Sequence, residues 1–286
     1  MQPKLGILAG GGALPKILIE TAMRSGREVF VVAFKGQADK DRLSDVPHAW
    51  VRLGAAGGAV RLLHEAGVVD VILAGTIKKP GLTQLMPDRR ALSILKKIGG
   101  LDQGDDSLLG GLVNELEEAE GFRVVGVADI APHLLAEPGA YGTLRPDAAA
   151  WADIRAAAIA ARDIGVRDLG QGAVVRGGTV LAVEDRAGTD AMLARVAEDH
   201  VAEGRDGDMG GVLVKTLKPG QERRVDLPTV GVRTVEGAKR AGLAGLAIEA
   251  GAALVMDRAA LGRAADAAGL FVIGIDVDAV LAEEEA

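Results

Sequence analysis

Lys4-Leu-Gly-Ile-Leu-Ala-Gly-Gly-Gly-Ala-Leu-Pro15 sets the architecture of the first half of this chain. A short apolar run ends there in three consecutive glycines, and a helical pattern follows from Leu14 to Met23. Pro15 suits the first turn of that helix, where its missing N–H leaves no bond unmade. A second apolar run spans Glu28 to Phe34. Strand, glycine turn, helix and strand in this order predict a β-α-β unit and a Rossmann-like start.

The alternation of strand and helix patterns continues beyond this unit. Prolines and glycines interrupt it from Asp129 to Pro146, which is typical of a linker. We therefore predict a Rossmann-like domain over residues 1–130, a linker over 131–146 and a second α/β domain over 147–286. In the first domain, strands are expected over 49–53, 68–74 and 122–127, and helices over 59–66, 91–98 and 108–119.

The second domain is predicted to contain a mixed sheet. An alanine-rich helix over Asp147 to Ile164 opens it. Apolar runs over 171–175 and 179–184, joined by Arg176-Gly-Gly178, predict a β-hairpin. Thr189 is the residue type expected at the N-cap of the helix that follows. Later strands are expected over 212–214, 243–247 and 270–275, and later helices over 235–241 and 259–268.

Composition limits the classes of protein to which this chain can belong. Hydrophobic residues make up 49% and charged residues 26% of the 286 residues, as in a soluble globular protein with two domains. The net charge of −7 argues against a general nucleic-acid binder. Without cysteine, disulfides, thiol catalysis and cysteine-ligated zinc are excluded. The histidines are scattered, so any catalytic metal is expected to be a hard ion such as Mg²⁺.

The sequence predicts a cytoplasmic protein. No charged and apolar signal segment precedes the first strand pattern. The longest apolar stretch, Ala241 to Met256, contains Glu249 and is shorter than the roughly 20 residues that a membrane-spanning helix needs.

Three glycine-containing loops are candidates for contact with an anion. Gly10 to Gly12 precede a helix, whose N-terminus favours phosphate. The dinucleotide fingerprint is not satisfied, because its third glycine is replaced by Pro15, so we interpret the loop as a phosphate or nucleotide contact and not an NAD site. The alternative is that these glycines only turn the chain. The other two loops contain Gly75, Thr76 and Lys78, which follow a strand, and Gly188, Thr189 and Asp190, which precede a helix.

The acidic pair Asp105-Asp106 and the single Asp190 also have structural explanations. Asp106 or Ser107 is expected to be the N-cap of the helix after it. Asp105 and Asp106 together are also suited to hold Mg²⁺, a polar substrate group or a basic residue. Asp190 is explained equally well by the dipole of its helix.

The stretch from Gly210 to Thr229 combines a buried strand with a basic loop. Lysines and arginines there surround one aspartate, Asp226, and prolines fix the turns. This pattern suits a site that grips phosphate oxygens while keeping one acid ionised. The alternative is a solvated loop with ordinary ion pairs, which contribute little to stability.

The motif Lys215-x-x-Lys218-Pro-Gly-Gln-x-Arg-Arg-x-Asp226-Leu-Pro-Thr resembles the signature of the LpxI-type UDP-2,3-diacylglucosamine pyrophosphatases of lipid A biosynthesis. The resemblance extends to Gly6 to Pro15, to Gly104-Asp-Asp-Ser-Leu-Leu109, and to Val180-Leu-Ala-Val-Glu184-x-x-x-Gly-Thr-Asp190-Ala-Met192. It covers nearly the whole chain.

This resemblance implies Mg²⁺-dependent hydrolysis of UDP-2,3-diacylglucosamine to lipid X and UMP in an inter-domain cleft, with water attacking the sugar-proximal phosphorus. Asp226 would be the metal ligand or the general base, and Lys215, Lys218 and Arg224 would offset phosphoryl charge. It also implies peripheral contact with lipid on the cytoplasmic face of the inner membrane, and a homodimer. The expected substrate-binding residues are Gly10, Gly11, Gly12, Ala13, Leu14, Gly75, Thr76, Lys78, Gln103, Asp105, Asp106, Gln171, Glu184, Gly188, Thr189, Asp190, Gln221 and Thr229.

Two other classes of function stay open at this point. An NAD(P)-binding Rossmann oxidoreductase would use Gly10 to Gly12 for the cofactor, although the third glycine and the ribose-binding acid are missing. A non-catalytic nucleotide or lipid carrier would bind the same ligand without hydrolysing it.

Overall fold

The computed structural model describes residues 2–43, 45–78, 85–98, 105–204 and 208–282. The chain divides into two compact units. The first unit contains Met1–Pro132 and Glu222–Asp226, and the second contains His133–Gln221 and Leu227–Ala286. Segment 222–226 therefore folds with the first unit, while the residues on both sides of it fold with the second.

The first unit is built on a five-stranded parallel sheet with strand order β3-β2-β1-β4-β5. This order, with β1 in the centre and the chain moving outward to either side, is that of a Rossmann-like domain. The predicted Rossmann-like start is thus confirmed. The strands are β1 (Leu5–Ala9), β2 (Val29–Phe34), β3 (His48–Val51), β4 (Asp70–Ala74) and β5 (Arg123–Val124).

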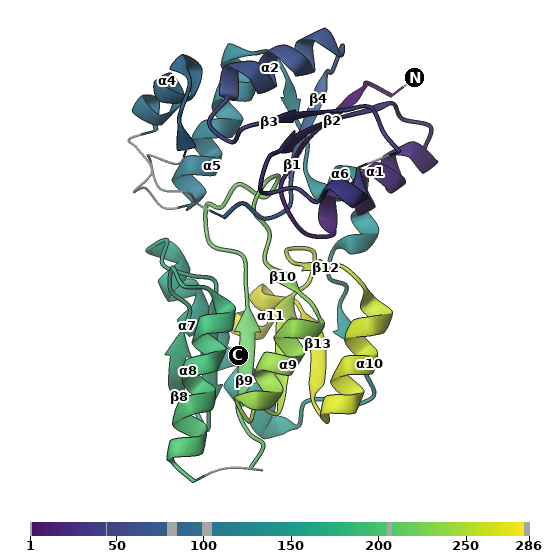
Figure 1. Ribbon diagram of the computed structural model, residues 1–286. Coiled ribbons are helices and arrows are strands. Elements are labelled where there is room, and N and C mark those ends of the chain that lie inside the picture. The colour runs from purple at the N-terminus through teal and green to yellow at the C-terminus, as the bar shows by residue number, and fades with distance from the viewer. Residues whose placement is uncertain (1, 44, 79–84, 99–104, 205–207, 283–286) are drawn as a thin grey trace. The chain divides into compact units, whose positions relative to one another are not determined.

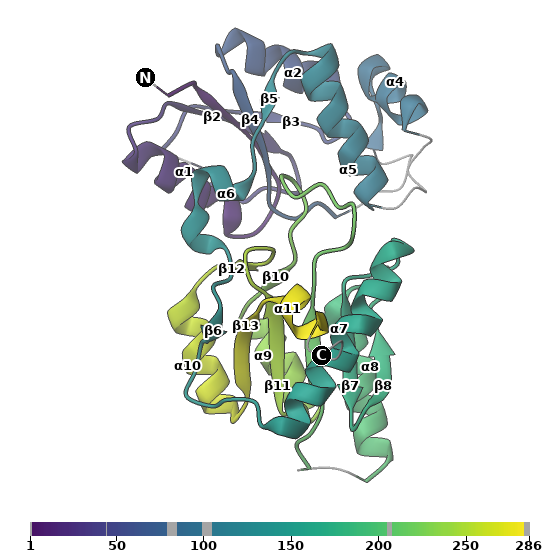
Figure 2. The same cartoon turned by 180° about the vertical axis from the view of Figure 1, so that it is seen from behind.

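Helices cover both faces of this sheet (Figure 1, Figure 2). On one face α2, α5 and the short π-helix η2 enclose an apolar cluster that includes Leu8, Val32, Leu63 and Leu116. On the other face lie α1 and α6. The helical segments are α1 (Leu14–Arg24), η1 (Lys40–Arg42), α2 (Ala56–Glu65), α4 (Arg89–Lys97), α5 (Asp105–Asn114), η2 (Glu115–Ala119) and α6 (Val127–Ile130). The short helix η3 (Pro132–Leu134) begins at the last residue of the first unit and continues into the second.

Two local predictions for the first unit were wrong. Asp106 and Ser107 lie inside α5, so neither is the N-cap of this helix. The strand expected over 122–127 is limited to Arg123–Val124, because Gly126 donates its N–H to Asp129 Oδ2 at 2.8 Å and so begins α6.

The second unit contains a six-stranded mixed sheet with strand order β6-β13-β11-β9-β7-β8. Strands β13, β11 and β9 are parallel, whereas β6 pairs antiparallel with β13, and the hairpin β7–β8 pairs antiparallel with β9. The predicted mixed sheet and hairpin are confirmed. The strands are β6 (Gly139–Ala140), β7 (Gly172–Arg176), β8 (Thr179–Val183), β9 (Val212–Lys215), β11 (Gly245–Glu249) and β13 (Phe271–Ile275), with a separate parallel pair of β10 (Thr229–Val230) and β12 (Leu254–Val255).

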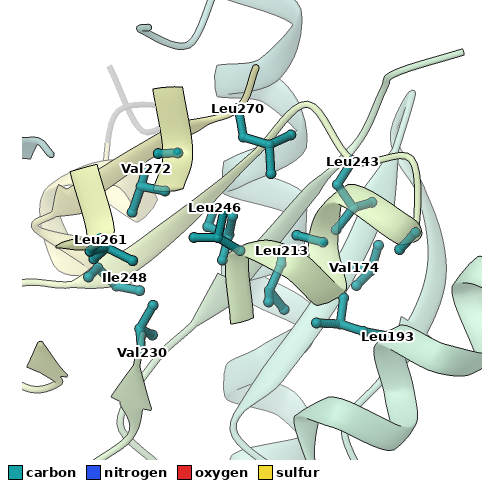
Figure 3. Packing of buried hydrophobic residues seen from close by; sticks show 14 of the residues in the cluster. Val174, Leu193, Leu213, Val230, Leu243, Leu246, Ile248, Leu261, Leu270 and Val272 are labelled. Carbon is teal, nitrogen blue, oxygen red and sulfur yellow. The ribbon is translucent and has the colours of Figure 1, made fainter. Parts of the chain in front are cut away.

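Alternate residues of these strands face two apolar layers, as the two-residue period of a strand requires. Val174, Leu213 and Leu246 point to one layer, where Leu193 of α8 and Leu261 of α10 pack against them (Figure 3). The opposite layer joins the other strand residues to α7. The helices are α7 (Ala148–Val166), α8 (Thr189–Ala202), α9 (Val232–Arg240), α10 (Arg258–Ala268) and α11 (Val277–Ala282). Among the helices described, none combines the length and the apolar character needed to cross a membrane.

A buried ion triad lies at the amino end of β4. Asp70 is fully buried and accepts hydrogen bonds from Arg123 Nε at 2.8 Å and from Arg123 Nη2 at 2.6 Å. It also forms a short ion pair with Arg27, whose side chain is buried and whose Nε bonds to Pro3 O at 2.7 Å. This triad joins β4 to β5 and to the segment before β2.

We expect Asp70→Asn to destabilise the first unit by about 3 to 5 kcal/mol, because it leaves the charge of Arg27 buried without its counter-ion. Urea unfolding followed by Trp50 fluorescence in a Trp151→Phe background measures this unit, since Trp50 is in β3 and Trp151 is in α7. The control is Glu20→Gln, which breaks the exposed Lys16–Glu20 pair of α1 and should cost less than about 0.5 kcal/mol. Equal effects of the two substitutions would contradict a stabilising role for the triad.

Candidate functional site

The glycine loop after β1 packs directly against the loop after β4. Gly11 N donates to Thr76 O at 2.8 Å, and Thr76 N donates to Gly11 O at 3.0 Å. A Cβ atom on Gly10 would lie 2.5 Å from Thr76 O, and one on Gly75 would lie 2.4 Å from Gly11 O. These two glycines are thus required for the close approach of the two loops.

Hydrogen bonding within the protein limits which groups of this loop can meet an anion. Gly10 N already donates to Ala74 O at 2.8 Å, and Gly11 N is used by Thr76. Gly12 and Ala13 are exposed at the start of α1, and Leu14 is half-buried. Anion contact at this helix N-terminus would therefore rely on the N–H groups after Gly11.

A residue that sequence reasoning missed fixes the position of Lys78. Gln37 follows β2, and its amide group bonds to the backbone of Lys78 in both directions, with Lys78 N to Gln37 Oε1 at 2.9 Å and Gln37 Nε2 to Lys78 O at 3.1 Å. The side chain of Lys78 is exposed. A single glutamine in a loop carries no periodic signal, so only the fold brings these residues together.

Segment 222–226 is attached to the first unit by Arg224 and Val225. Arg224 Nη1 donates to Glu117 Oε1 at 2.8 Å and to Val124 O at 3.2 Å. Its Nε and Nη2 donate to the two oxygens of Glu222 at 2.9 and 2.8 Å. Val225 packs against the apolar cluster beneath α2 and α5. The segment is therefore held by both ionic and apolar contacts.

The charges around Arg224 stabilise one another. Hydrogen bonding from Arg224 lowers the pKa of Glu222 below its ordinary value, and Glu222 raises the pKa of Arg224. Both groups are thus charged at neutral pH. Asp226 follows two residues later, is half-buried, and its backbone N–H bonds to Glu222 O at 3.1 Å, which closes a turn.

A buried polar cluster surrounds Lys215 at the end of β9 in the second unit. Lys215 is 4% exposed, and its Nζ donates to Thr189 Oγ1 at 2.5 Å. The Thr189 hydroxyl in turn donates to Glu184 Oε1 at 3.0 Å. Glu184 is 7% exposed, and its Oε2 lies 3.8 Å from Lys215 Nζ. Lysine, hydroxyl and carboxylate therefore form one connected group from β9, α8 and the residue after β8.

The N-cap role predicted for Thr189 was wrong. The N-cap of α8 is Gly188, which adopts a positive φ of 86° and provides no side-chain bond. The hydroxyl of Thr189 instead forms hydrogen bonds with Lys215 and Glu184. Both of these charged groups are buried, and a buried charge without a hydrogen-bond partner costs more free energy than a helix end without a side-chain cap.

Lys218 is held by a second carboxylate that the sequence did not reveal. Lys218 Nζ donates to Asp168 Oδ1 at 2.7 Å, and Lys218 is 8% exposed. Asp168 has a φ of 53°, a left-handed conformation that non-glycine residues rarely adopt. Gly165 permits the approach of this loop, since a Cβ there would lie 3.1 Å from Pro219 Cδ.

The loop after β9 is further shaped by backbone contacts with side chains. Leu217 N donates to Glu249 Oε2 at 2.7 Å, and Lys218 N donates to Gln221 Oε1 at 3.0 Å. Thr216 N bonds to Gln171 O at 3.0 Å. The second unit thus brings Lys215, Lys218, Gln171 and Gln221 into one loop cluster, together with the unforeseen Glu249.

Other predicted residues lie at the margins or outside the description. Asp190 forms an exposed ion pair with Arg233 at 2.6 Å, and Thr229 is exposed. Gln103 lies outside the described residues. Asp105 and Asp106 lie in α5, where only the backbone is described. In the part of the chain that the structure describes, no group of three or more His, Cys, Asp or Glu is arranged to hold a metal ion.

Comparison with known proteins relates both units to one family. The family description "LpxI N-terminal domain" matches residues 4–134, and "LpxI C-terminal domain" matches residues 137–273. The UDP-2,3-diacylglucosamine pyrophosphatase LpxI of Caulobacter vibrioides is 45% identical over 275 residues, which cover 96% of this chain and 98% of that protein.

Among solved structures, the similarities found are weak. A carboxyaminoimidazole ribonucleotide synthase from Aspergillus clavatus in complex with ATP is 15% identical, with a TM-score of 0.23, and the match covers 64% of this chain and 39% of that one. An L-amino acid ligase from Bacillus licheniformis has the same identity and TM-score, with 74% and 43% covered. Similarities at this level carry no argument.

The cluster around Lys215 predicts how two substitutions of Thr189 differ. Thr189→Val keeps the shape of the side chain but removes the hydroxyl that joins two buried charges, so it should destabilise the second unit by about 1 to 3 kcal/mol. Thr189→Ser keeps the hydroxyl and should cost less than about 1 kcal/mol. Urea unfolding followed by Trp151 fluorescence in a Trp50→Phe background measures both. Equal costs would contradict a bridging role for the hydroxyl.

Proposed function

We propose, because this chain belongs to the LpxI family, that it is a pyrophosphatase that hydrolyses the diphosphate of UDP-2,3-diacylglucosamine to lipid X and UMP. The observation that carries the proposal is the relative from Caulobacter vibrioides, which bears that name and is similar to this chain over both units. Both family domains are matched in their order along the chain. The loop from Lys215 to Thr229 provides the charged residues that such a reaction requires.

In the proposed reaction, a water oxygen bonds to the sugar-proximal phosphorus, and the bond from that phosphorus to the bridging oxygen breaks. UMP leaves with the bridging oxygen, and the new oxygen stays in the 1-phosphate of the sugar. Asp226 is proposed to orient this water and to accept its proton. A half-buried carboxylate on a closed turn suits that role, because its position is fixed while water still reaches it.

Lys215 and Lys218 are proposed to contact the diphosphate oxygens. Both side chains are buried and oriented by carboxylates of their own unit, so their charges are fixed in direction before a ligand arrives. Cations held in this way stabilise developing negative charge without reorganising during the reaction. The other substrate contacts predicted from the sequence, on the glycine loops and elsewhere in both units, are part of the same proposal.

Mg²⁺ is proposed as the cofactor, with Asp226 as its protein ligand. Mg²⁺ commonly keeps several waters and binds one or two carboxylates together with substrate phosphates, so it needs no larger cage of protein ligands. One carboxylate near a diphosphate fits this mode. When bound, the ion would offset charge on the phosphoryl oxygens.

The substrate also bears on where the protein works. Two acyl chains hold such a molecule in a membrane, so we propose that the protein contacts the cytoplasmic face of the inner membrane peripherally. The oxidoreductase alternative loses support, because Gly10 and Gly11 use their N–H groups within the protein and Pro15 replaces the third glycine.

Asp226→Ala should lower the rate of UMP release at least about 100-fold, because a general base acts mainly in the transition state. The dissociation constant of the substrate should stay within a few-fold of that of the unchanged protein. Turnover is measured in ¹⁸O-labelled water, and the label should enter the 1-phosphate of lipid X. Asp278→Asn on α11, which removes an exposed carboxylate paired with Arg162, is the control and should leave turnover unchanged. Near-normal turnover by Asp226→Ala, or label in UMP, would overturn the assigned mechanism.

Removal of metal provides an independent check. EDTA should abolish UMP release, and added Mg²⁺ should restore it, while the far-ultraviolet circular dichroism spectrum stays the same. Full activity in the presence of EDTA would contradict the cofactor assignment but not the reaction itself.

A further inference from the structure

Segment 222–226 gives Arg224 surroundings that do not suit an anion-binding residue. Arg224 faces the carboxylates of Glu222 and Glu117 at 2.8 Å each. Two negative charges next to one positive charge leave this group with a net negative charge. A phosphate oxygen approaching it would meet repulsion from both carboxylates. Arg224 therefore has the surroundings of an anchor and not those of a phosphate contact.

Glu117 is the part of this anchor that comes from the body of the first unit. Its Oε1 accepts hydrogen bonds from Arg224 Nη1 at 2.8 Å and from Val124 N at 3.1 Å. It thereby joins β5 to segment 222–226. Glu222, in contrast, belongs to the segment itself, so its bonds to Arg224 shape the turn without attaching it to the unit.

The local helix geometry explains how Glu117 reaches this position. It lies in η2, a π-helix that continues α5. The wider turn of a π-helix changes the direction of the side chains on it, and such turns are frequent at functional sites. Glu115 and Leu116 are buried, whereas Glu118 is exposed, so the turn fixes which of the neighbouring acids meets Arg224.

Backbone packing adds to the attachment. A Cβ atom on Gly126 would lie 3.1 Å from Arg224 Cα, so the chain before α6 packs closely against the segment at this glycine. Val225 contributes apolar contact with the cluster on the α2 and α5 face. The salt bridge of Glu117 thus selects one position for a segment that is already packed closely.

We propose that Glu117 is a positioning residue for the hydrolysis, which acts through Arg224 to hold segment 222–226, and with it Asp226, on the first unit. The inference rests on the proposed role of Asp226. It assigns Arg224 to attachment, in place of the contact with phosphoryl oxygens that the sequence suggested. Because a shift of about 1 Å in a catalytic group can lower the rate about 100-fold, loss of the anchor should act on kcat more than on KM.

The first test compares Glu117→Ala with Glu118→Ala. Both remove one carboxylate from the same π-helix, but only Glu117 contacts Arg224. We expect Glu117→Ala to lower kcat by about 10- to 100-fold with KM within about twofold, and Glu118→Ala to leave both unchanged. If Glu117→Ala lowers the urea concentration at which the first unit unfolds, Glu117→Gln is measured in its place, since glutamine keeps the shape of the side chain and one hydrogen-bond acceptor. Unchanged kcat in both Glu117 variants would overturn the proposal.

A double-mutant comparison separates an anchor from a substrate contact. If Glu117 acts through Arg224, Glu117→Ala combined with Arg224→Ala should reduce kcat no further than Arg224→Ala alone. If Arg224 contacts the substrate directly, Arg224→Ala should raise KM and the two effects on the rate should multiply. The second result would overturn the proposal.

Hydrogen exchange tests the anchor without any reference to the reaction. Amides of residues 222–226 should exchange at least about tenfold faster in Glu117→Ala than in the unchanged protein, whereas Glu118→Ala should show no change. Faster exchange in a protein that releases no UMP would mean that the anchor exists and that the proposed function fails. Unchanged exchange in Glu117→Ala would mean that the anchor itself is wrong.

Discussion

The attachment of segment 222–226 to the first unit is the constraint on which the interpretation of this protein depends. The segment occupies five positions of a chain that otherwise belongs, on both sides, to the second unit. The charged residues of the loop from Lys215 to Thr229 consequently belong to two different folding units, with Lys215 and Lys218 in one and Arg224 and Asp226 in the other. Each group therefore obtains its orientation from a separate set of partners.

Periodic patterns in the sequence predicted most of the local structure correctly. The apolar alternation around Gly10 to Gly12, the hairpin over 171–184 and the mixed sheet all follow from local burial, which a sequence records directly. Strand order and capping were less accessible. Thr189 had every local feature of an N-cap, yet a buried lysine from a distant strand uses its hydroxyl.

The residues that orient the candidate site could not be predicted for the same physical reason. Asp168 and Lys218 are 50 positions apart, and Glu117 and Arg224 are 107 positions apart. Each carboxylate looks like an ordinary surface acid until the fold places it beside a cation. Sequence reasoning found the cations because they gather in one loop, and it missed Asp168 and Glu117 because they lie on other elements.

The acidic partners of Lys215, Lys218 and Arg224 indicate different roles for these three cations, which their side-chain types alone do not. Lys215 Nζ lies 3.8 Å from Glu184 Oε2 and Lys218 Nζ lies 2.7 Å from Asp168 Oδ1, and both lysines are buried, which preserves their orientation. Buried ion pairs are roughly neutral for stability when compared with apolar residues, because desolvation offsets their attraction. Stability alone therefore gives little reason to bury two lysines at the end of β9 and in the loop after it. Arg224, in contrast, is half-buried and lies between the carboxylates of Glu222 and Glu117. The same loop thus contains lysines held by acids of the second unit and an arginine held by two acids of the first unit.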